Sequence, residues 1–86
     1  MITPQLNLNG SSADDLTVPR LKAMDAIMDA IVALSQAVPN GRDYPGNAVA
    51  CTADREAHFA RTAALSAIRD DIDAEAIAIK QQQKEY

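Results

Sequence analysis

The sequence predicts an all-α protein: an antiparallel hairpin of two helices, the second one long, with an extended N-terminal arm and a tendency to self-associate. Three observations support this fold class. Residues 47–83 contain neither Pro nor Gly and are rich in residues that favour helices. Apolar residues recur every seven positions both before and after a stretch of turn residues. That stretch, residues 39–46, has the length of a connection between neighbouring antiparallel helices.

Composition limits both the size of the core and the class of partner. The 86 residues form a single domain, close to the size at which a chain needs support from a partner. The net charge is −4 and the basic residues form no stripe, which opposes direct binding to nucleic acid or to an anionic membrane. No apolar run approaches the roughly 20 residues of a membrane span, and residues 1–10 lack the pattern of a signal peptide. We therefore expect an intracellular protein, and the single Cys51 fits a reducing compartment.

Residues 1–11 are expected to form the extended arm. Leu6 and Leu8 alternate with asparagines, which would place both leucines on one side of an extended segment. Three interpretations stay open: an arm lying on the helices of its own chain, a disordered tail, or an arm that reaches a neighbouring subunit.

Residues 12–38 predict the first helix. Ser12 offers a cap, and the acidic residues after it favour the positive pole of a helix. Pro19 removes a backbone hydrogen bond and disfavours helical geometry at the residue before it. We therefore expect a kink near residue 18, or a separate turn followed by a main helix from about Pro19 to Val38.

The apolar face of this first helix is wider than one partner helix can cover. Its main seam consists of Met24, Ile27, Ile31, Leu34 and Val38. Leu21, Met28 and Val32 extend the apolar surface around one flank. Contact with a single helix would leave part of this surface open.

Residues 39–46 predict the connection and residues 47–83 the second helix. The Asn-Gly pair in the connection tolerates positive φ. Asn47 can cap the second helix, with Thr52 as the alternative. The seam of this helix consists of Cys51, His58, Leu65, Ile72 and Ile79, with Ile68 and Ala76 beside them.

Equal spacing of the two seams predicts their register. The seams stay in phase when Val38 is paired with Cys51, Ile31 with His58, Met24 with Leu65 and residue 17 with Ile72. This register puts residue 10 beside Ile79, so Leu6 and Leu8 are the expected cover for Ile77 and Ile79. A separate stripe of small residues on the second helix is open to two interpretations, a surface for close approach of another helix or a solvated face. This stripe consists of Ala60, Ala63, Ala67, Ala74 and Ala78.

Side chains with catalytic chemistry are few. Asp54 lies one turn before His58 and could orient its imidazole. Cys51 and His58 share a face, but about 10.5 Å of helix separates them, too far for a Cys-His nucleophile pair. They also lack a further ligand of the usual type for a metal. The sequence predicts no catalytic, cofactor-binding or metal-binding residue and indicates no small-molecule substrate.

The connection holds the clearest candidates for partner binding. Arg42, Asp43 and Tyr44 combine a forked donor, an acceptor and an amphipathic ring on a loop held by two helices. A structural role, with an Arg-Asp pair and a packed Tyr, is the alternative. The candidate partner-binding residues are therefore Arg42, Asp43, Tyr44, Leu6, Leu8, Ile77 and Ile79.

Two short segments, Ser12-Ala13-Asp14-Asp15-Leu16 and Pro39-Asn40-Gly41-Arg42-Asp43-Tyr44, resemble small uncharacterised helical-hairpin proteins encoded in tailed-phage and prophage genomes. The resemblance brings no catalytic residues. It implies a phage setting, in the host cytoplasm or incorporated into a virion. We expect a non-enzymatic protein-protein interaction protein, a minor structural or assembly component of a phage. The alternative is an accessory inhibitor or regulator that binds a host protein.

Overall fold

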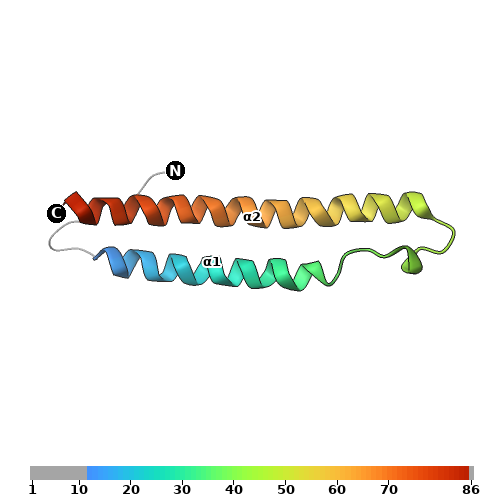
Figure 1. Ribbon diagram of the computed structural model, residues 1–86, viewed down its shortest axis with the longest axis horizontal. Helices are drawn as coiled ribbons and strands as arrows, with labels where there is room; N and C mark the ends of the chain where they lie inside the picture. The colour runs from blue at the N-terminus through green and yellow to red at the C-terminus, as the bar shows by residue number, and fades with distance from the viewer. Residues whose placement is uncertain (1–11, 86) are drawn as a thin grey trace.

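The computed structural model describes the backbone of residues 12–85 and the side chains of residues 12–82. The described chain is all-helical and contains no strand: α1 spans Ala13–Ser35, a short 3-10 helix η1 spans Gly41–Asp43, and α2 spans Ala48–Glu85. The molecule is an elongated rod with extents of 65 × 19 × 16 Å (Figure 1).

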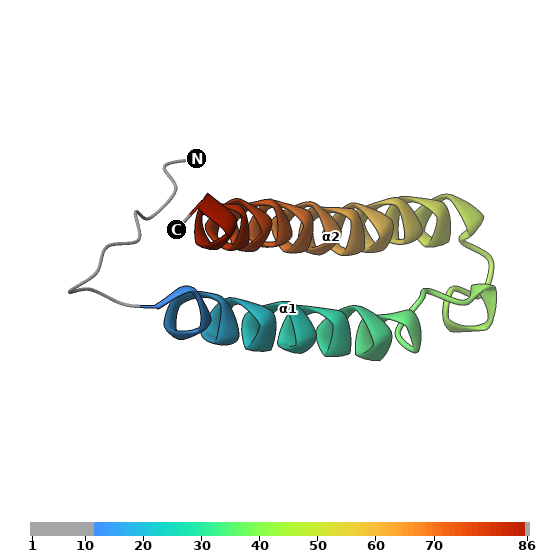
Figure 2. The ribbon, with the colours of Figure 1, turned by 60° about the vertical axis from the view of Figure 1, so that its left-hand side comes forward.

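The two helices form a hairpin, as predicted, and the second is the longer (Figures 1 and 2). The start of α1 meets the end of α2, where Lys80 Nζ lies 3.0 Å from Asp14 Oδ1. At the other end Arg55 Nε donates a hydrogen bond of 2.8 Å to the carbonyl of Pro39. The candidate residues Leu6 and Leu8, and the whole N-terminal arm, lie outside the described residues.

The start of α1 is fixed by a capping box. The backbone N–H of Asp15 donates to Ser12 Oγ at 3.1 Å, and the backbone N–H of Ser12 donates to Asp15 Oδ2 at 3.2 Å. Two of the helix-terminal donors are thereby satisfied, and the acidic groups also favour the positive end of the helix. The helix therefore begins at Ala13.

α1 is a single helix that continues through Pro19, so the separate turn that was one of the two sequence-based expectations is not formed. Proline has no N–H, so the carbonyl four residues before Pro19 lacks its usual donor. Side chains donate hydrogen bonds to carbonyls shortly before and shortly after that one. Thr17 Oγ1 donates to the carbonyl of Ala13 at 2.8 Å, and Arg20 Nη1 donates to that of Leu16 at 2.6 Å. The capping box and these bonds offset part of the loss at Pro19.

α1 ends at Ser35, three residues before the expected end at Val38. The last turn tightens, since the N–H of Gln36 donates to the carbonyl of Ala33 at 3.2 Å and that of Ala37 to Leu34 at 2.9 Å. Such short-range bonds close a helix, and the proline at position 39 disfavours helical geometry just before it. The connection is consequently longer than the expected residues 39–46.

An asparagine caps η1 in the connection, and a second asparagine caps α2. Asn40 Oδ1 accepts from the N–H of Arg42 at 2.9 Å, which holds the start of η1. Asn47 Oδ1 accepts from the N–H of Ala50 at 3.1 Å, so the first of the two predicted caps of α2 is the one used. The Asn-Gly pair does not use positive φ, because Asn40 has φ of −112°; the left-handed residue is Gly46, with φ of 72°.

The two glycines of the connection give a matched test of this backbone. Gly46→Ala is expected to lower the free energy of unfolding by about 1–2 kcal/mol, because an L-residue is strained at its positive φ. Gly41→Ala is the control, since a Cβ there meets no atom within 4 Å and φ is negative. Urea denaturation followed by circular dichroism measures both. Equal losses in the two variants would contradict the assigned turn.

The predicted seams form the interface between α1 and α2. The buried residues of the described chain are Ala13, Thr17, Met24, Cys51, His58, Ala76 and Ile79. The other predicted seam residues, such as Ile31 and Leu65, are half-buried. Ile68, expected beside the seam, is instead 51% exposed. A single partner helix covers only a narrow strip of α2, and Ile68 lies outside it.

The register differs from the expected one by about one and a half helical turns. The register expected from the sequence would set Asp14 opposite Glu75 and Arg20 opposite Arg69. In the structure Asp14 pairs with Lys80, and Arg20 pairs with Glu75. The long connection explains the shift, because it occupies the side of the first turns of α2 that the end of α1 was expected to cover.

Candidate functional site

The connection is bound to the first turns of α2. The hydroxyl of Tyr44 donates a hydrogen bond to Asp54 Oδ2, and Arg55 holds the carbonyl of Pro39. The hydrogen bond to Asp54 raises the pKa of Tyr44 from 10.0 to about 12, since the nearby carboxylate favours the protonated phenol. Tyr44 thus fastens the connection to α2, and its ring is half-buried.

This pKa predicts a loss of stability at high pH. A raised folded-state pKa contributes stability that is complete below about pH 10 and disappears as the pH rises through about 12. In a Tyr86→Phe background, where Tyr44 is the remaining tyrosine of the two, absorbance at 295 nm should show a midpoint near 12. Adding Asp54→Asn should bring the midpoint back toward 10, and an unchanged midpoint would contradict the contact.

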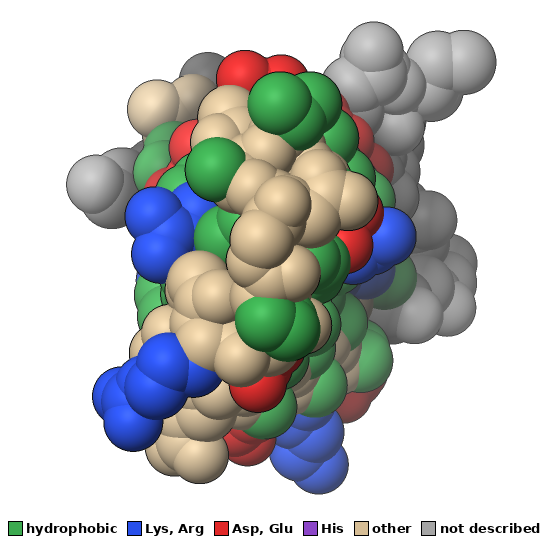
Figure 3. Space-filling model, turned by 90° about the vertical axis from the view of Figure 1, so that its right-hand side faces the viewer, with side chains coloured by type: hydrophobic (Ala, Val, Ile, Leu, Met, Phe, Trp, Pro, Cys, Tyr) green, Lys and Arg blue, Asp and Glu red, His purple; other side chains and the backbone are tan. Residues whose placement is uncertain are grey.

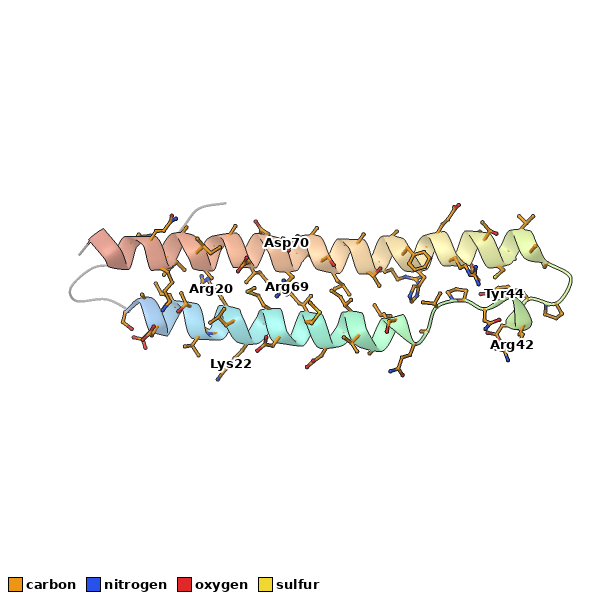
Figure 4. The ribbon with its side chains drawn as sticks, in the orientation of Figure 1. Arg20, Lys22, Arg42, Tyr44, Arg69 and Asp70 are labelled. Atoms are coloured by element: carbon orange, nitrogen blue, oxygen red, sulfur yellow. The ribbon has the colours of Figure 1, made fainter. Side chains whose placement is uncertain are left out.

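Arg42 and Asp43 are exposed at this end of the rod. Arg42 points away from α2, whereas Tyr44 lies between the connection and that helix (Figure 4). Seen from this end, basic, acidic and apolar side chains are interspersed (Figure 3). Of the three candidates, Arg42 and Asp43 are accessible to a partner, and Tyr44 serves the fold.

Ile77 and Ile79, predicted together as a partner-binding pair, have different environments. Ile79 is 0% exposed and packs with Ala13 and Leu16 in the core of the hairpin. Ile77 is 51% exposed. Of the two, Ile77 is the side chain available to a partner.

His58 and Cys51 are both buried between the helices and the connection. The ring of His58 contacts that of Phe59 edge to face, with centroids 5.7 Å apart and planes at 80°. Asp54, the carboxylate expected to orient His58, is bound to Tyr44. The part of the chain that the structure describes holds no group of three or more His, Cys, Asp or Glu placed to bind a metal. In the same part, no helix is long and apolar enough to cross a bilayer.

Charged groups bridge α1 and α2 at two places. Arg20 pairs with Glu75, and Lys80 pairs with Asp14. Arg20 and Arg69 both extend into the space between the helices, whereas Lys22 points away from α2 (Figure 4). Nε of Arg69 is buried and has no hydrogen-bond partner among the described residues. These ion pairs are consistent with the observed register and were not foreseen from the seams.

A broad apolar surface runs along one face of the hairpin. Eight large apolar side chains are exposed in the described chain. The positions of six of them around their helix axes place them on this face. We call these six the outer apolar face: Val18, Leu21, Met28 and Val32 of α1, and Phe59 and Ile77 of α2. Their exposed fractions range from 40% to 54%. The remaining two, Val49 and Ile68, lie elsewhere on α2.

The two helices meet on the outer apolar face in a shallow groove. A depression of about 260 Å³ is lined by side chains that include Leu21 of α1 and Ile77 of α2. Polar side chains line it as well: Thr17, Asp73, Lys80 and Gln81. The groove brings Leu21 of α1 and Ile77 of α2 together on this face, near the end of the hairpin that holds the start of α1.

Part of this face was visible in the sequence. Leu21, Met28 and Val32 were identified as an apolar flank that one helix cannot cover, and all three are exposed. Ile77 was predicted to bind a partner, but together with Ile79 and not as part of this face. The contribution of Phe59 was missed, because a single apolar residue on α2 gains meaning only once the register is known. The small-residue stripe is also at the surface: Ala60, Ala63, Ala67 and Ala74 are exposed and Ala78 is half-buried.

No protein-family model matches this chain, and neither a curated protein nor a solved structure matches it.

Proposed function

We propose that this protein is a non-enzymatic helical interaction protein that associates with itself and serves as a minor structural or assembly component of a phage. The observation that carries the proposal is the outer apolar face, which the two-helix hairpin leaves open. Contiguous apolar surface of this kind marks interaction sites in small proteins. The phage setting rests on the resemblance of residues 12–16 and 39–44 to phage-encoded hairpins.

Two measurements test the two parts of this proposal. Light scattering over a concentration series should give a mass above the 9.2 kDa of one chain. Mass spectrometry of purified virions from a host carrying the gene should find the protein in a constant ratio to the other virion proteins. A single-chain mass at every concentration would reject self-association, and absence from virions would reject a structural role there.

A second candidate function is an accessory inhibitor or regulator that binds a host protein. The observation that favours it is the exposure of Arg42 and Asp43 on a connection whose backbone is fixed by Asn40 and Tyr44. Immobilised protein should then capture one host protein in fixed stoichiometry. The variant Arg42→Ala with Asp43→Ala should lose it, and Asp29→Ala, at another exposed acid, should retain it. Capture of virion proteins alone would count against this function.

A further inference from the structure

We propose that the outer apolar face binds the same face of a second copy of this chain, with α1 lying against α1 of the second copy in the opposite direction. The inference rests on the proposed self-association and specifies its surface and arrangement. Each hairpin would contribute two helices to a four-helix bundle in which every neighbouring pair runs antiparallel.

α1 carries two apolar seams rather than one. The first, which includes Thr17 and Met24, is buried against α2. The second consists of positions spaced alternately by three and four: Val18, Leu21, Asp25, Met28 and Val32. Each position follows a position of the first seam by one residue. The second seam is therefore rotated by about 100° around the helix axis from the first. Two such seams are typical of a helix with two neighbours, and the described hairpin supplies one.

The second seam matches itself when it is reversed. Val18 and Val32 stand seven residues on either side of Asp25, and Leu21 and Met28 stand four before it and three after it. Two antiparallel copies centred on Asp25 therefore bring each valine against the other valine, and each leucine against a methionine. A surface that complements itself in this way is what a two-fold dimer requires.

α1 of one copy can pack against either α1 or α2 of the second copy. The residues that α2 carries on the outer apolar face favour packing of α1 against α1. The positions of α2 that share the outer face run from Phe59 to Ile77 at spacings of three and four. Between these two large side chains the positions are held by Ala63, Ser66, Asp70 and Asp73. Packing Leu21 and Met28 onto them would bury carboxylates against apolar groups, which is unfavourable. Pairing α1 with itself keeps Leu21 and Met28 among apolar side chains, with the Asp25 pair at the two-fold axis. Asp70 and Asp73 of α2 then face the α2 of the second copy and not the apolar seam of α1.

The side of the rod that carries the outer apolar face has room for an interface of standard size. A side of the rod measures 65 by 19 Å, which corresponds to about 1,200 Å². A standard specific interface takes about 800 Å² from each partner. Covering about two thirds of this side is therefore sufficient, and its large side chains are already arranged along it.

Sedimentation velocity of charge variants tests the choice of face. Leu21→Glu should raise the dissociation constant of the dimer at least about tenfold, because each dimer gains two charges within apolar surface. Ile68→Glu is the matched control: its side chain is 51% exposed, close to the 46% of Leu21, and lies off the outer apolar face. Far-ultraviolet circular dichroism should show equal helicity in both variants.

The outcomes separate this inference from the proposed function. If the unmodified chain is a single species of one-chain mass at all concentrations, self-association fails and the inference fails with it. If the unmodified chain associates, but Ile68→Glu separates the copies and Leu21→Glu does not, self-association stands and the outer apolar face is not its surface.

Disulfide trapping tests the arrangement. In a Cys51→Ala background, mild oxidation of Asp25→Cys should give a covalent dimer, because the two copies of this position meet at the axis. Asp29→Cys is the control; reversal places it about 12 Å along the helix from its own copy, so it should cross-link far less. Equal or greater cross-linking through Asp29→Cys would overturn the α1-to-α1 arrangement.

Discussion

Replacing Ile79 by alanine is expected to lower the free energy of unfolding by about 2–5 kcal/mol. The side chain is 0% exposed and closes the end of the hairpin against Ala13 and Leu16. Its truncation removes buried apolar surface and leaves a cavity that the two helices cannot easily close. Urea denaturation followed by circular dichroism at 222 nm measures the loss.

Ile68→Ala is the control for this prediction. It makes the same chemical change in the same helix, but its side chain is 51% exposed and lies outside the outer apolar face. Its effect should stay below about 1 kcal/mol. Similar losses in the two variants would mean that Ile79 is not a core residue of the hairpin.

Replacing Pro19 by alanine is expected to raise the free energy of unfolding by about 2 kcal/mol. Pro19 stands inside α1 and its side chain is exposed. Alanine restores a backbone donor for the carbonyl four residues earlier and relieves the clash with it. The gain is smaller than the full proline penalty in helices, because proline also restricts the unfolded chain. Denaturation in urea gives the change directly.

Pro45→Ala provides the comparison of opposite sign. Pro45 is exposed in the connection and belongs to no helix. Its replacement only frees the unfolded chain, so stability should fall by about 0.4–1 kcal/mol. If Pro19→Ala were neutral or destabilising, the backbone at residue 19 would not be helical.

The sequence predicted the two helices of this hairpin better than the register between them. The absence of Pro and Gly after residue 46, together with the cap at Asn47, located α2 to within two residues at either end. The heptad seams correctly indicated burial of Met24, His58 and Ile79. These features depend on local geometry, which neighbouring residues determine.

The register and the course of the connection could not be predicted in this way. Several registers keep two heptad seams in phase, and the choice among them depends on contacts between distant residues. Here the observed register is the one in which Arg20 pairs with Glu75, Lys80 pairs with Asp14, and the connection bonds to α2. The candidate site changed with it: Tyr44 and Ile79 turned out to serve the fold, whereas the apolar flank that includes Leu21 lies open.

Small-angle X-ray scattering of the unmodified protein tests the central claim most directly, because one curve gives both mass and shape. A dimer joined through its outer apolar faces should have twice the 9.2 kDa mass of one chain and a longest dimension near the 65 Å of one hairpin, with a thicker cross-section. A single-chain mass, or a dimer of about twice that length, would contradict the account.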